Sequence, residues 1–327
     1  MWLYRCFLFF SSIFLTTQSQ SIPVKNNCNV LSIGIGGSYS PIYIAMLEKY
    51  RLEKYDLYAG ISIGGSFSGT LSFFNGNINE GIDFLKKHFT FNKDFTHRRY
   101  IKYQSIMEMY RRKSFLNNEF PEMHHYIYES LKKTKKTEIP QIHVPSLVGA
   151  VHKSTNQFHI FDLSKYNETI QLELFLSTVS IKYFYPSTKL SIYNQGINNE
   201  FIDGGTSKAF IIEQIEQYID CQFYNITLFS IIQLHPMSSK SYSFKTSIFH
   251  LSINQYLYLH YSLLFYYQII VELDQPCPIN VKGHLHLCYV NTTKLSHYSP
   301  LDFRHNDELY EIGLKHTTCK TYNYCGK

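Results

Sequence analysis

Short apolar runs separated by glycine-rich turns dominate the first part of the chain. Residues 29–33 form such a run and predict a strand. The turn GIGGSYS follows at 34–40, and a helical pattern of apolar residues begins after it. Ser40 is the expected N-cap of that helix, and Pro41 suits its first position. The segment therefore predicts strand, glycine turn and helix, in that order.

A second unit of the same kind follows directly. Residues 57–59 predict a short strand, residues 60–65 (GISIGG) a tight turn, and residues 66–74 a helix rich in small side chains. Two strand–turn–helix units in succession indicate a central, mostly parallel sheet with helices packed on it. We therefore expect an α/β fold.

The rest of the chain shows no internal repeat and no low-complexity linker, so a single domain is expected. Residues 247–273 are aromatic and nearly uncharged, and three interpretations stay open for them: a core helix, an interfacial helix or a membrane span. The other predicted elements are helices within 79–135, a strand pair at 142–153 and 157–163, a helix at 168–180, a strand running into a glycine turn at 200–205, a helix at 207–219 and a buried strand at 225–236.

The composition limits the classes of partner. The chain has 327 residues, 44% of them hydrophobic, which is enough for a sizeable core. The formal net charge of +6 is a mild bias over this length. It favours anionic surfaces such as lipid headgroups and does not indicate nucleic acid. We expect peripheral contact with a membrane or lipid surface, and the sequence does not indicate an oligomeric state.

The N-terminus is typical of a secretory signal peptide. Arg5 precedes an apolar run from Cys6 to Leu15, which is short for a membrane span and is followed by small and polar residues. We expect residues 1–20 to be removed and the mature protein to be secreted or to enter the lumen of the secretory pathway. Sequons for N-glycosylation begin at Asn167, Asn225 and Asn291.

The cysteines agree with an oxidising compartment. Six remain after the signal peptide, an even number that fits up to three disulfides and allows 15 pairings. No two of them have Cys-x-x-Cys spacing, so no zinc site is expected. The six are Cys28, Cys221, Cys277, Cys288, Cys319 and Cys325.

The second glycine turn contains the pattern Gly-x-Ser-x-Gly, in which Gly60 and Gly64 flank Ser62. A serine in such a strand-to-helix elbow is held in a strained conformation with its hydroxyl exposed. The N-terminus of the helix favours negative charge that develops there. Ser62 is therefore a candidate nucleophile, and a plain packing turn is the alternative for the same five residues.

The first glycine turn, GIGGSYS, presents backbone N–H groups above the sheet, where they can bind an anion. A dinucleotide fingerprint fits it poorly, because Tyr39 occupies the third glycine position and Asp56 precedes the second strand instead of ending it. The other interpretation is an oxyanion hole, in which Gly36, Gly37 and Ser38 donate N–H groups to a tetrahedral intermediate.

Asp203 ends a predicted strand and is followed by Gly204 and Gly205. Alone, an Asp-Gly-Gly turn is common. In an α/β sheet, however, turns at the carboxyl ends of strands collect on one edge, where sites form. We therefore expect Asp203 to lie near Ser62 and near the first glycine turn.

Together the segments LSIGIGGSYS, AGISIGG and FIDGGTSKAF resemble the patatin-like phospholipase family, which has a glycine-rich oxyanion loop, a Gly-x-Ser-x-Gly elbow and a late Asp-Gly-Gly or Asp-Gly-Ala. STVSIKYFYPSTKL and LDFRHNDELYEIGLK resemble two further segments of that family. The likeness covers residues 28–316 and leaves 317–327 as a cysteine-containing tail. It implies a modified α/β-hydrolase-like, three-layer sandwich.

The resemblance also implies a chemistry. A Ser–Asp dyad hydrolyses lipid acyl esters in that family, so here Ser62 would attack the ester carbonyl and Asp203 would take its proton directly, without metal or cofactor. Such a base must be poorly solvated, so that its basicity rises. The expected activity is a serine-dependent lipid acyl hydrolase with a lipid or phospholipid substrate.

The first glycine turn departs from the family's Gly-Gly-Gly-x-Arg/Lys-Gly. Ile35, Tyr39 and Ser40 stand where the family has a glycine, a basic residue and a glycine. This departure leaves open a weakly active or inactive protein that binds lipid or a partner. A Ser–His–Asp esterase also stays open, because histidines follow Asp203 in the chain. They include His235, His284 and His286.

Overall fold

The computed structural model describes residues 25–74, 77–90, 128–133, 142, 144–181, 186–193, 199–231, 282–290, 294–295, 298 and 305–323. Predictions for the signal peptide at 1–20, for 247–273, for Cys277 and Cys325, for His235 and for Asn291 lie outside these residues. Within the described ranges, no helix is long and apolar enough to cross a bilayer.

The described strands form one mixed sheet. Its parallel strands are β1 (Lys25–Ile33), β2 (Leu57–Ile61), β3 (Ser146–His152), β7 (Cys221–Ser230) and β8 (Gly283–Val290). Its antiparallel strands are β4 (Phe158–Asp162), β5 (Thr188–Lys189), β6 (Glu200–Asp203) and β9 (Thr317–Asn323). The parallel centre has the order β3-β2-β1-β7-β8, with β4, β6 and β5 at one margin and β9 at the other. The fold is therefore α/β with a mostly parallel sheet, as the sequence predicts.

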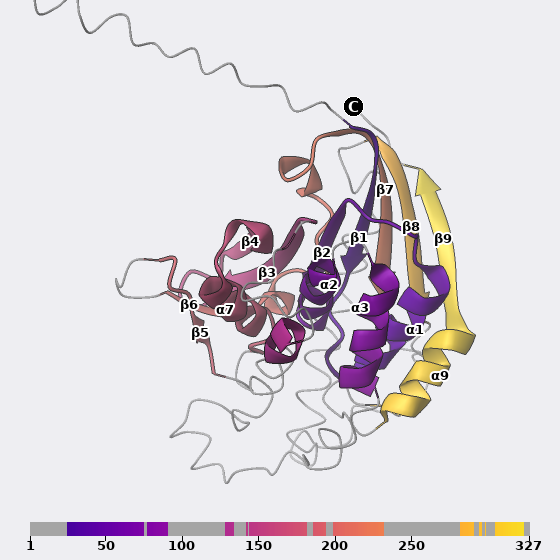
Figure 1. The fold of residues 1–327 in the computed structure, drawn as a ribbon, viewed down its shortest axis with the longest axis horizontal. Coiled ribbons are helices and arrows are strands. Elements are labelled where there is room, and N and C mark those ends of the chain that lie inside the picture. The colour runs from indigo at the N-terminus through magenta and orange to yellow at the C-terminus, as the bar shows by residue number, and fades with distance from the viewer. Residues whose placement is uncertain are drawn as a thin grey trace, which may run out of the picture.

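Helices cover one face of this sheet. They are α1 (Ser40–Tyr50), α2 (Ile63–Phe73), α3 (Ile78–Leu85), α7 (Glu168–Thr178) and α9 (Asn306–His316), and Figure 1 shows them in front of the strands. Alternate side chains of a strand point to opposite faces. Leu31 and Ile33 of β1 pack on the helix side, whereas Val30 packs on the other. The central strands are buried on both faces, which is why they appear as continuous apolar runs.

Residues 207–219 cover the opposite face of the sheet. The sequence predicts a helix for this segment. That prediction is wrong, because within this segment only Ile215–Gln217 form a short 3-10 turn. The carbonyl oxygen of Ala209 accepts from the N–H of Ile35 (3.0 Å) and so binds the loop after β1 instead of a helical amide. Consecutive apolar residues, 210–212, are then all buried. All three pack into the core on the face opposite the helices.

The start of α1 also differs from the prediction. A 3-10 turn, Gly37–Tyr39, runs directly into α1, so the N-cap is Tyr39 and not Ser40. Tyr39 makes no side-chain capping bond, and Pro41 lies in the first turn as expected. Elsewhere the predicted strand pair is confirmed as β3 and β4, and the predicted helix at 168–180 is confirmed as α7.

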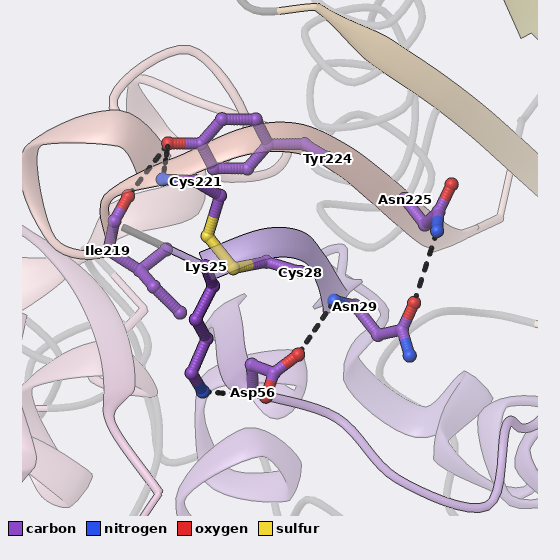
Figure 2. The surroundings of a disulfide bond; sticks show 8 residues. All are labelled: Lys25, Cys28, Asn29, Asp56, Ile219, Cys221, Tyr224 and Asn225. Atoms are coloured by element: carbon purple, nitrogen blue, oxygen red, sulfur yellow. Dashed lines mark hydrogen bonds and ion pairs between the residues drawn. A yellow bond between two sulfur atoms is a disulfide. The ribbon is translucent and has the colours of Figure 1, made fainter. Parts of the chain in front are cut away.

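Disulfide bonds are confirmed, and one of them joins two central strands. Cys28 of β1 is bonded to Cys221 of β7 over a sequence separation of 193 residues (Figure 2). Beside it, the carboxylate of Asp56 accepts from the backbone N–H of Asn29 (2.9 Å) and pairs with Lys25 (3.0 Å). The amino-terminal halves of the two strands are therefore tied covalently, next to an ion pair that fixes the loop before β2.

The second disulfide lies at the far margin of the sheet. Residues 317–323, which the sequence assigns to a tail after the domain, form β9 and extend the same sheet. Cys319 of β9 lies opposite Cys288 of β8 and is bonded to it, with Cα atoms 4.0 Å apart. The sheet therefore continues through Asn323.

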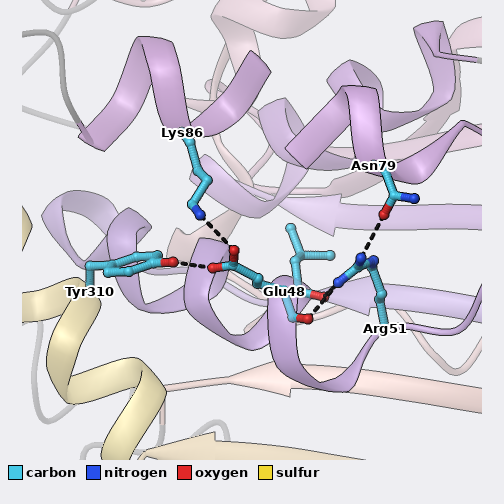
Figure 3. A network of polar contacts seen from close by, with 6 residues as sticks. Glu48, Arg51, Asn79, Lys86 and Tyr310 are labelled. Carbon is cyan, nitrogen blue, oxygen red and sulfur yellow. Dashed lines mark hydrogen bonds and ion pairs between the residues drawn. The ribbon is translucent and has the colours of Figure 1, made fainter. Parts of the chain in front are cut away.

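A polar network fastens α1 to α9 and to the end of α3 (Figure 3). The Glu48 carboxylate accepts from the ammonium of Lys86 (2.6 Å) and from the hydroxyl of Tyr310. Arg51 donates to the side-chain oxygen of Asn79 (2.6 Å). Burial opposes ionisation of Glu48, but hydrogen bonds from Lys86 and Tyr310 outweigh it and lower the pKa of Glu48. These contacts therefore hold α1, α3 and α9 together within the helical layer.

Candidate active site

Ser62 lies in the sharp turn between β2 and α2. Its backbone has φ 58° and ψ −131°, a left-handed conformation that is strained for a residue with a side chain. Two glycines permit the turn. A Cβ on Gly60 would lie 2.2 Å from the carbonyl oxygen of Gly64, and a Cβ on Gly64 would lie 2.2 Å from that of Ile33. The Gly-x-Ser-x-Gly pattern is therefore a steric requirement of this strand-to-helix contact.

The hydroxyl of Ser62 does not cap α2, although Ser62 is its N-cap residue. A serine at that position usually accepts from an amide of the first helical turn. Here Oγ donates instead to Oδ2 of Asp203 over 2.6 Å. Ser62 is 6% exposed. A packing turn does not require a buried serine hydroxyl bonded to a carboxylate. The contact therefore favours the interpretation of Ser62 as a nucleophile.

Asp203 is the last residue of β6 and is 3% exposed. Its other oxygen, Oδ1, accepts from the backbone N–H of Gly205 (2.7 Å). Burial raises the pKa of Asp203 to about 7, although the hydrogen bonds from Ser62 and Gly205 oppose the rise. A carboxylate with this pKa can accept a proton near neutral pH.

Asp203 reaches Ser62 by a different route from the predicted one. The prediction relies on the carboxyl ends of neighbouring strands meeting at one edge, but β6 runs antiparallel to β3, and Asp203 pairs with Ala150. Ser62 follows Ile61, which pairs with Gly149, the residue before Ala150. β6 therefore ends at the point of β3 where the pairing with β2 also ends. The register of β6 on β3, and not a shared strand direction, brings the carboxylate to the serine.

The two glycines after Asp203 have different roles. They open a 3-10 turn, Gly204–Thr206. A Cβ on Gly204 would lie 2.6 Å from the carbonyl oxygen of Gly149, and Gly205 supplies the N–H that binds the carboxylate. The Asp-Gly-Gly pattern therefore serves both the turn and the orientation of Asp203.

The first glycine turn lies against the start of α2. A Cβ on Gly36 would lie 3.2 Å from Cγ2 of Ile63, the residue after Ser62. Gly37 has φ 54°, which glycine adopts without strain. Gly36 and Gly37 are half-buried, whereas Ser38 is fully buried. Of the three candidate oxyanion donors, Gly36 and Gly37 are therefore more accessible than Ser38.

The residues that depart from the family pattern anchor this turn. Ile35 packs in the core on the face opposite the helices. Tyr39 is 3% exposed, and its hydroxyl donates to the carbonyl oxygen of Tyr298 (2.8 Å). Ser40 is buried at the start of α1. The turn is therefore held by packing and a tyrosine hydrogen bond, and no basic residue stands at Tyr39.

Sequence reasoning missed Thr178, the last residue of α7. Its hydroxyl accepts from the backbone N–H of Ser62 (2.9 Å) and donates to the carbonyl oxygen of Gly149 (2.8 Å). The sequence predicts the helix but carries no signal for this contact, because 116 residues separate the two partners.

The geometry favours a dyad over a Ser–His–Asp triad. Ser62 contacts Asp203 directly, with no histidine between them. His286 of β8 contacts Thr321 of β9 (3.0 Å), and β7 and β1 separate β8 from β2. His284 lies on the same strand, β8. Among the described residues, no group of three or more His, Cys, Asp or Glu side chains could hold a metal ion.

Fold and site together define an α/β protein with a buried serine–aspartate pair at a strand-to-helix elbow. No protein-family model matches the sequence, and no curated protein matches it. Among solved structures the chain is similar to VipD from Legionella pneumophila, with a TM-score of 0.35 and 10% identity over 91% of this chain and 68% of that one. It is also similar to a chain of the complex of full-length SpcU with full-length ExoU from the type III secretion system of Pseudomonas aeruginosa, with a TM-score of 0.26 and 12% identity over 92% of this chain and 55% of that one. Likenesses this distant carry no argument about function, which rests on the site itself.

Proposed function

We propose that the chain is a serine-dependent acyl-ester hydrolase that acts on lipids through Ser62 and Asp203. The hydrogen bond of 2.6 Å between their side chains carries the proposal, because it joins a serine in a strained elbow to a buried base. The sequence resemblance to patatin-like phospholipases supports the same pair. The reaction needs only these groups and water.

Acylation begins with ionised Asp203. Its carboxylate accepts the proton of Ser62 as Oγ bonds to the ester carbonyl carbon, and the carbonyl oxygen becomes an oxyanion. The N–H groups of Gly36 and Gly37, together with the positive end of α2, would stabilise that charge. The intermediate collapses when the leaving alcohol takes the proton from Asp203, and the acyl group stays on Ser62.

Deacylation repeats these steps with water as the nucleophile. Asp203 accepts a proton from water while the water oxygen bonds to the acyl carbon. The second tetrahedral intermediate collapses as the proton returns to Oγ of Ser62. The products are a carboxylic acid and the free enzyme, so all atoms are accounted for.

The pH dependence of the reaction tests the proposed base. Only the ionised form of Asp203 can accept a proton, so the rate should rise with pH up to a pKa of about 7 and then level off. At pH 5 the rate should be about 100-fold below the plateau. We would measure the second-order rate constant for labelling by a fluorophosphonate probe between pH 5 and 9, with mass spectrometry to locate the label on Ser62. A rate that stays flat over this range would exclude Asp203 as the base.

A lipid substrate is inferred from the sequence resemblance and from the net charge of +6, which favours anionic surfaces. Release of fatty acid from vesicles of phosphatidylcholine with 20% phosphatidylglycerol, by the purified mature chain, would support it. Hydrolysis of soluble short-chain esters without any release from vesicles would retain the dyad and contradict the lipid substrate.

A second candidate function is non-catalytic binding of lipid or a partner. Tyr39 favours it, because a buried tyrosine stands where the family has a basic residue. Correctly folded protein that neither reacts with the fluorophosphonate probe nor releases fatty acid would decide for this function.

We also propose that the chain is exported, since the two disulfides among the described residues are typical of oxidising compartments. Asn167 is exposed, and its Oδ1 caps α7 by accepting from Ile170 N–H (3.1 Å), which leaves Nδ2 free of the cap. Asn225 lies in the centre of the sheet on β7, with Nδ2 donating to Asn29 (3.3 Å). We expect a glycan on Asn167 and none on Asn225 in protein secreted by eukaryotic cells.

Enzymatic release of the glycans in heavy-oxygen water marks every occupied asparagine and so tests this pattern. We expect Asn167 to be marked and Asn225 to be unmarked. Marking of Asn225, or of neither residue in fully secreted protein, would contradict it.

A further inference from the structure

Thr178 contacts the candidate nucleophile through its backbone. The N–H of Ser62 has no acceptor within α2, because Ser62 is the N-cap and precedes the first helical turn. The hydroxyl of Thr178 supplies the acceptor over 2.9 Å. A buried N–H without an acceptor costs free energy, so this hydrogen bond stabilises the strained turn at Ser62.

The hydroxyl of Thr178 has a fixed direction. A threonine hydroxyl has one proton and two lone pairs. Its proton is used by the carbonyl oxygen of Gly149 (2.8 Å), so a lone pair is left for the N–H of Ser62. The side chain is fully buried, and a Cβ on Gly65 would lie 2.7 Å from the Thr178 oxygen. Thr178 is therefore pressed against the first turn of α2 and cannot point elsewhere.

The same short segment also holds the base. The carbonyl oxygen of Ser180, two residues after Thr178, accepts from the backbone N–H of Asp203 (2.9 Å). Residues 178–180 thus bind the backbones of both members of the Ser62–Asp203 pair, which come from strands β2 and β6. A strained residue such as Ser62 persists only where its surroundings fix it more than once.

We propose that Thr178 is a positioning residue, whose hydroxyl sets the backbone of Ser62 so that Oγ faces Asp203. The effect of Thr178 on the rate rests on the proposed function. Its hydrogen bond to the Ser62 amide does not depend on that function. The segment ending α7 would act as a clamp that fixes the distance between nucleophile and base.

Two substitutions separate the hydroxyl from the packing of Thr178. Thr178→Val keeps the shape but removes the hydroxyl, and Thr178→Ser keeps the hydroxyl but removes the methyl group that lies 3.0 Å from the Cβ position of Gly65. Both should lower the thermal midpoint. Thr178→Val should lower kcat by about 10- to 100-fold with little change in KM, because one buried hydrogen bond at the nucleophile is lost. Thr178→Ser should keep kcat within about threefold of the wild type.

The control is Ser177→Ala, which removes a buried hydroxyl that donates to the carbonyl oxygen of Leu174 in the same helix (2.9 Å). It should lower stability and leave kcat unchanged. Activity would be measured as hydrolysis of a soluble p-nitrophenyl ester, and hydrogen exchange of the Ser62 amide would be measured by mass spectrometry. Exchange should be faster in Thr178→Val and unchanged in Thr178→Ser.

The two readouts distinguish the two proposals. Equal kcat in the valine and serine variants, or unchanged exchange of the Ser62 amide in Thr178→Val, would overturn the positioning role. If the wild-type chain hydrolyses no ester while amide exchange follows the hydroxyl, the proposed function fails and the hold of Thr178 on Ser62 is supported.

Discussion

Replacing Ser62 with alanine is expected to reduce ester hydrolysis by at least about 10⁴-fold, because the nucleophile of a covalent mechanism has no substitute in the site. The variant should remain folded, since among the described residues the hydroxyl bonds Asp203 alone and does not cap α2. The strained turn is set by Gly60, Gly64 and the backbone of Ser62, which alanine preserves. Loss of fatty-acid release and of fluorophosphonate labelling, at an unchanged circular dichroism spectrum, is the expected combination.

A matched control for this experiment lies in the same helix. Ser72 is fully buried in α2, and its hydroxyl donates to the carbonyl oxygen of Gly69 (2.7 Å). Ser72→Ala removes a buried hydroxyl away from the elbow and should retain wild-type kcat/KM. Retention of activity in Ser62→Ala would show that another residue is the nucleophile, and the proposed mechanism would then be wrong.

Replacing Asp203 with asparagine is expected to lower kcat/KM by about 10³-fold, because asparagine cannot accept the serine proton. The geometry should survive. The amide oxygen can accept from Gly205 as Oδ1 does, and the amide nitrogen can donate to Oγ of Ser62. The loss of rate would therefore report on the base itself.

The same substitution should stabilise the fold at alkaline pH. The folded-state pKa of Asp203 is raised from its ordinary value of 3.8 to about 7. Between these two values the folded state holds a proton that the unfolded state has lost, so stability falls as pH rises through this window. Above about pH 7 the folded protein carries the buried charge and bears its full cost. Asparagine has no such cost, so its thermal midpoint should exceed that of the wild type at pH 8 and approach it at pH 4.

Asp162 provides the control carboxylate. It is 6% exposed at the end of β4 and accepts from the N–H and the hydroxyl of Ser164 (3.0 and 2.6 Å). Asp162→Asn should leave the rate unchanged and lower the thermal midpoint. A thermal midpoint of Asp203→Asn below that of the wild type at pH 8, with the same trend at pH 4, would contradict a buried charge that destabilises the fold.

The parts of the site that depend on local sterics were predictable from the sequence. Gly60 and Gly64 are required wherever a strand turns into a helix this sharply, so they mark Ser62 within five residues. The Asp-Gly-Gly turn is similar, because Gly204 is needed where the chain turns directly after Asp203. The central strands are buried on both faces, and for this reason they were recognisable in the sequence as apolar runs.

The parts that depend on distant contacts were not predictable. Residues 207–219 have a helical pattern, but the carbonyl oxygen of Ala209 binds the loop after β1. The antiparallel direction of β6 follows from its pairing with β3, which no local pattern encodes. Thr178 is one threonine at the end of a helix, and only the folded chain shows which amide it accepts from. The sequence likewise left all 15 pairing schemes open, and only the folded chain shows Cys28 bonded to Cys221 and Cys288 to Cys319.

The Gly-x-Ser-x-Gly pattern combines two signals, one for the architecture of the elbow and one for its chemistry. The steric role of the glycines separates the two. Gly60 and Gly64 are needed for β2 and α2 to meet, whether or not any reaction takes place there. A relative of this chain that had lost its activity would therefore still keep both glycines, whereas Ser62 and Asp203 would be free to change. In a search through other genomes, the glycines would identify the architecture. The serine together with the aspartate, far apart in the sequence, would identify the members able to react.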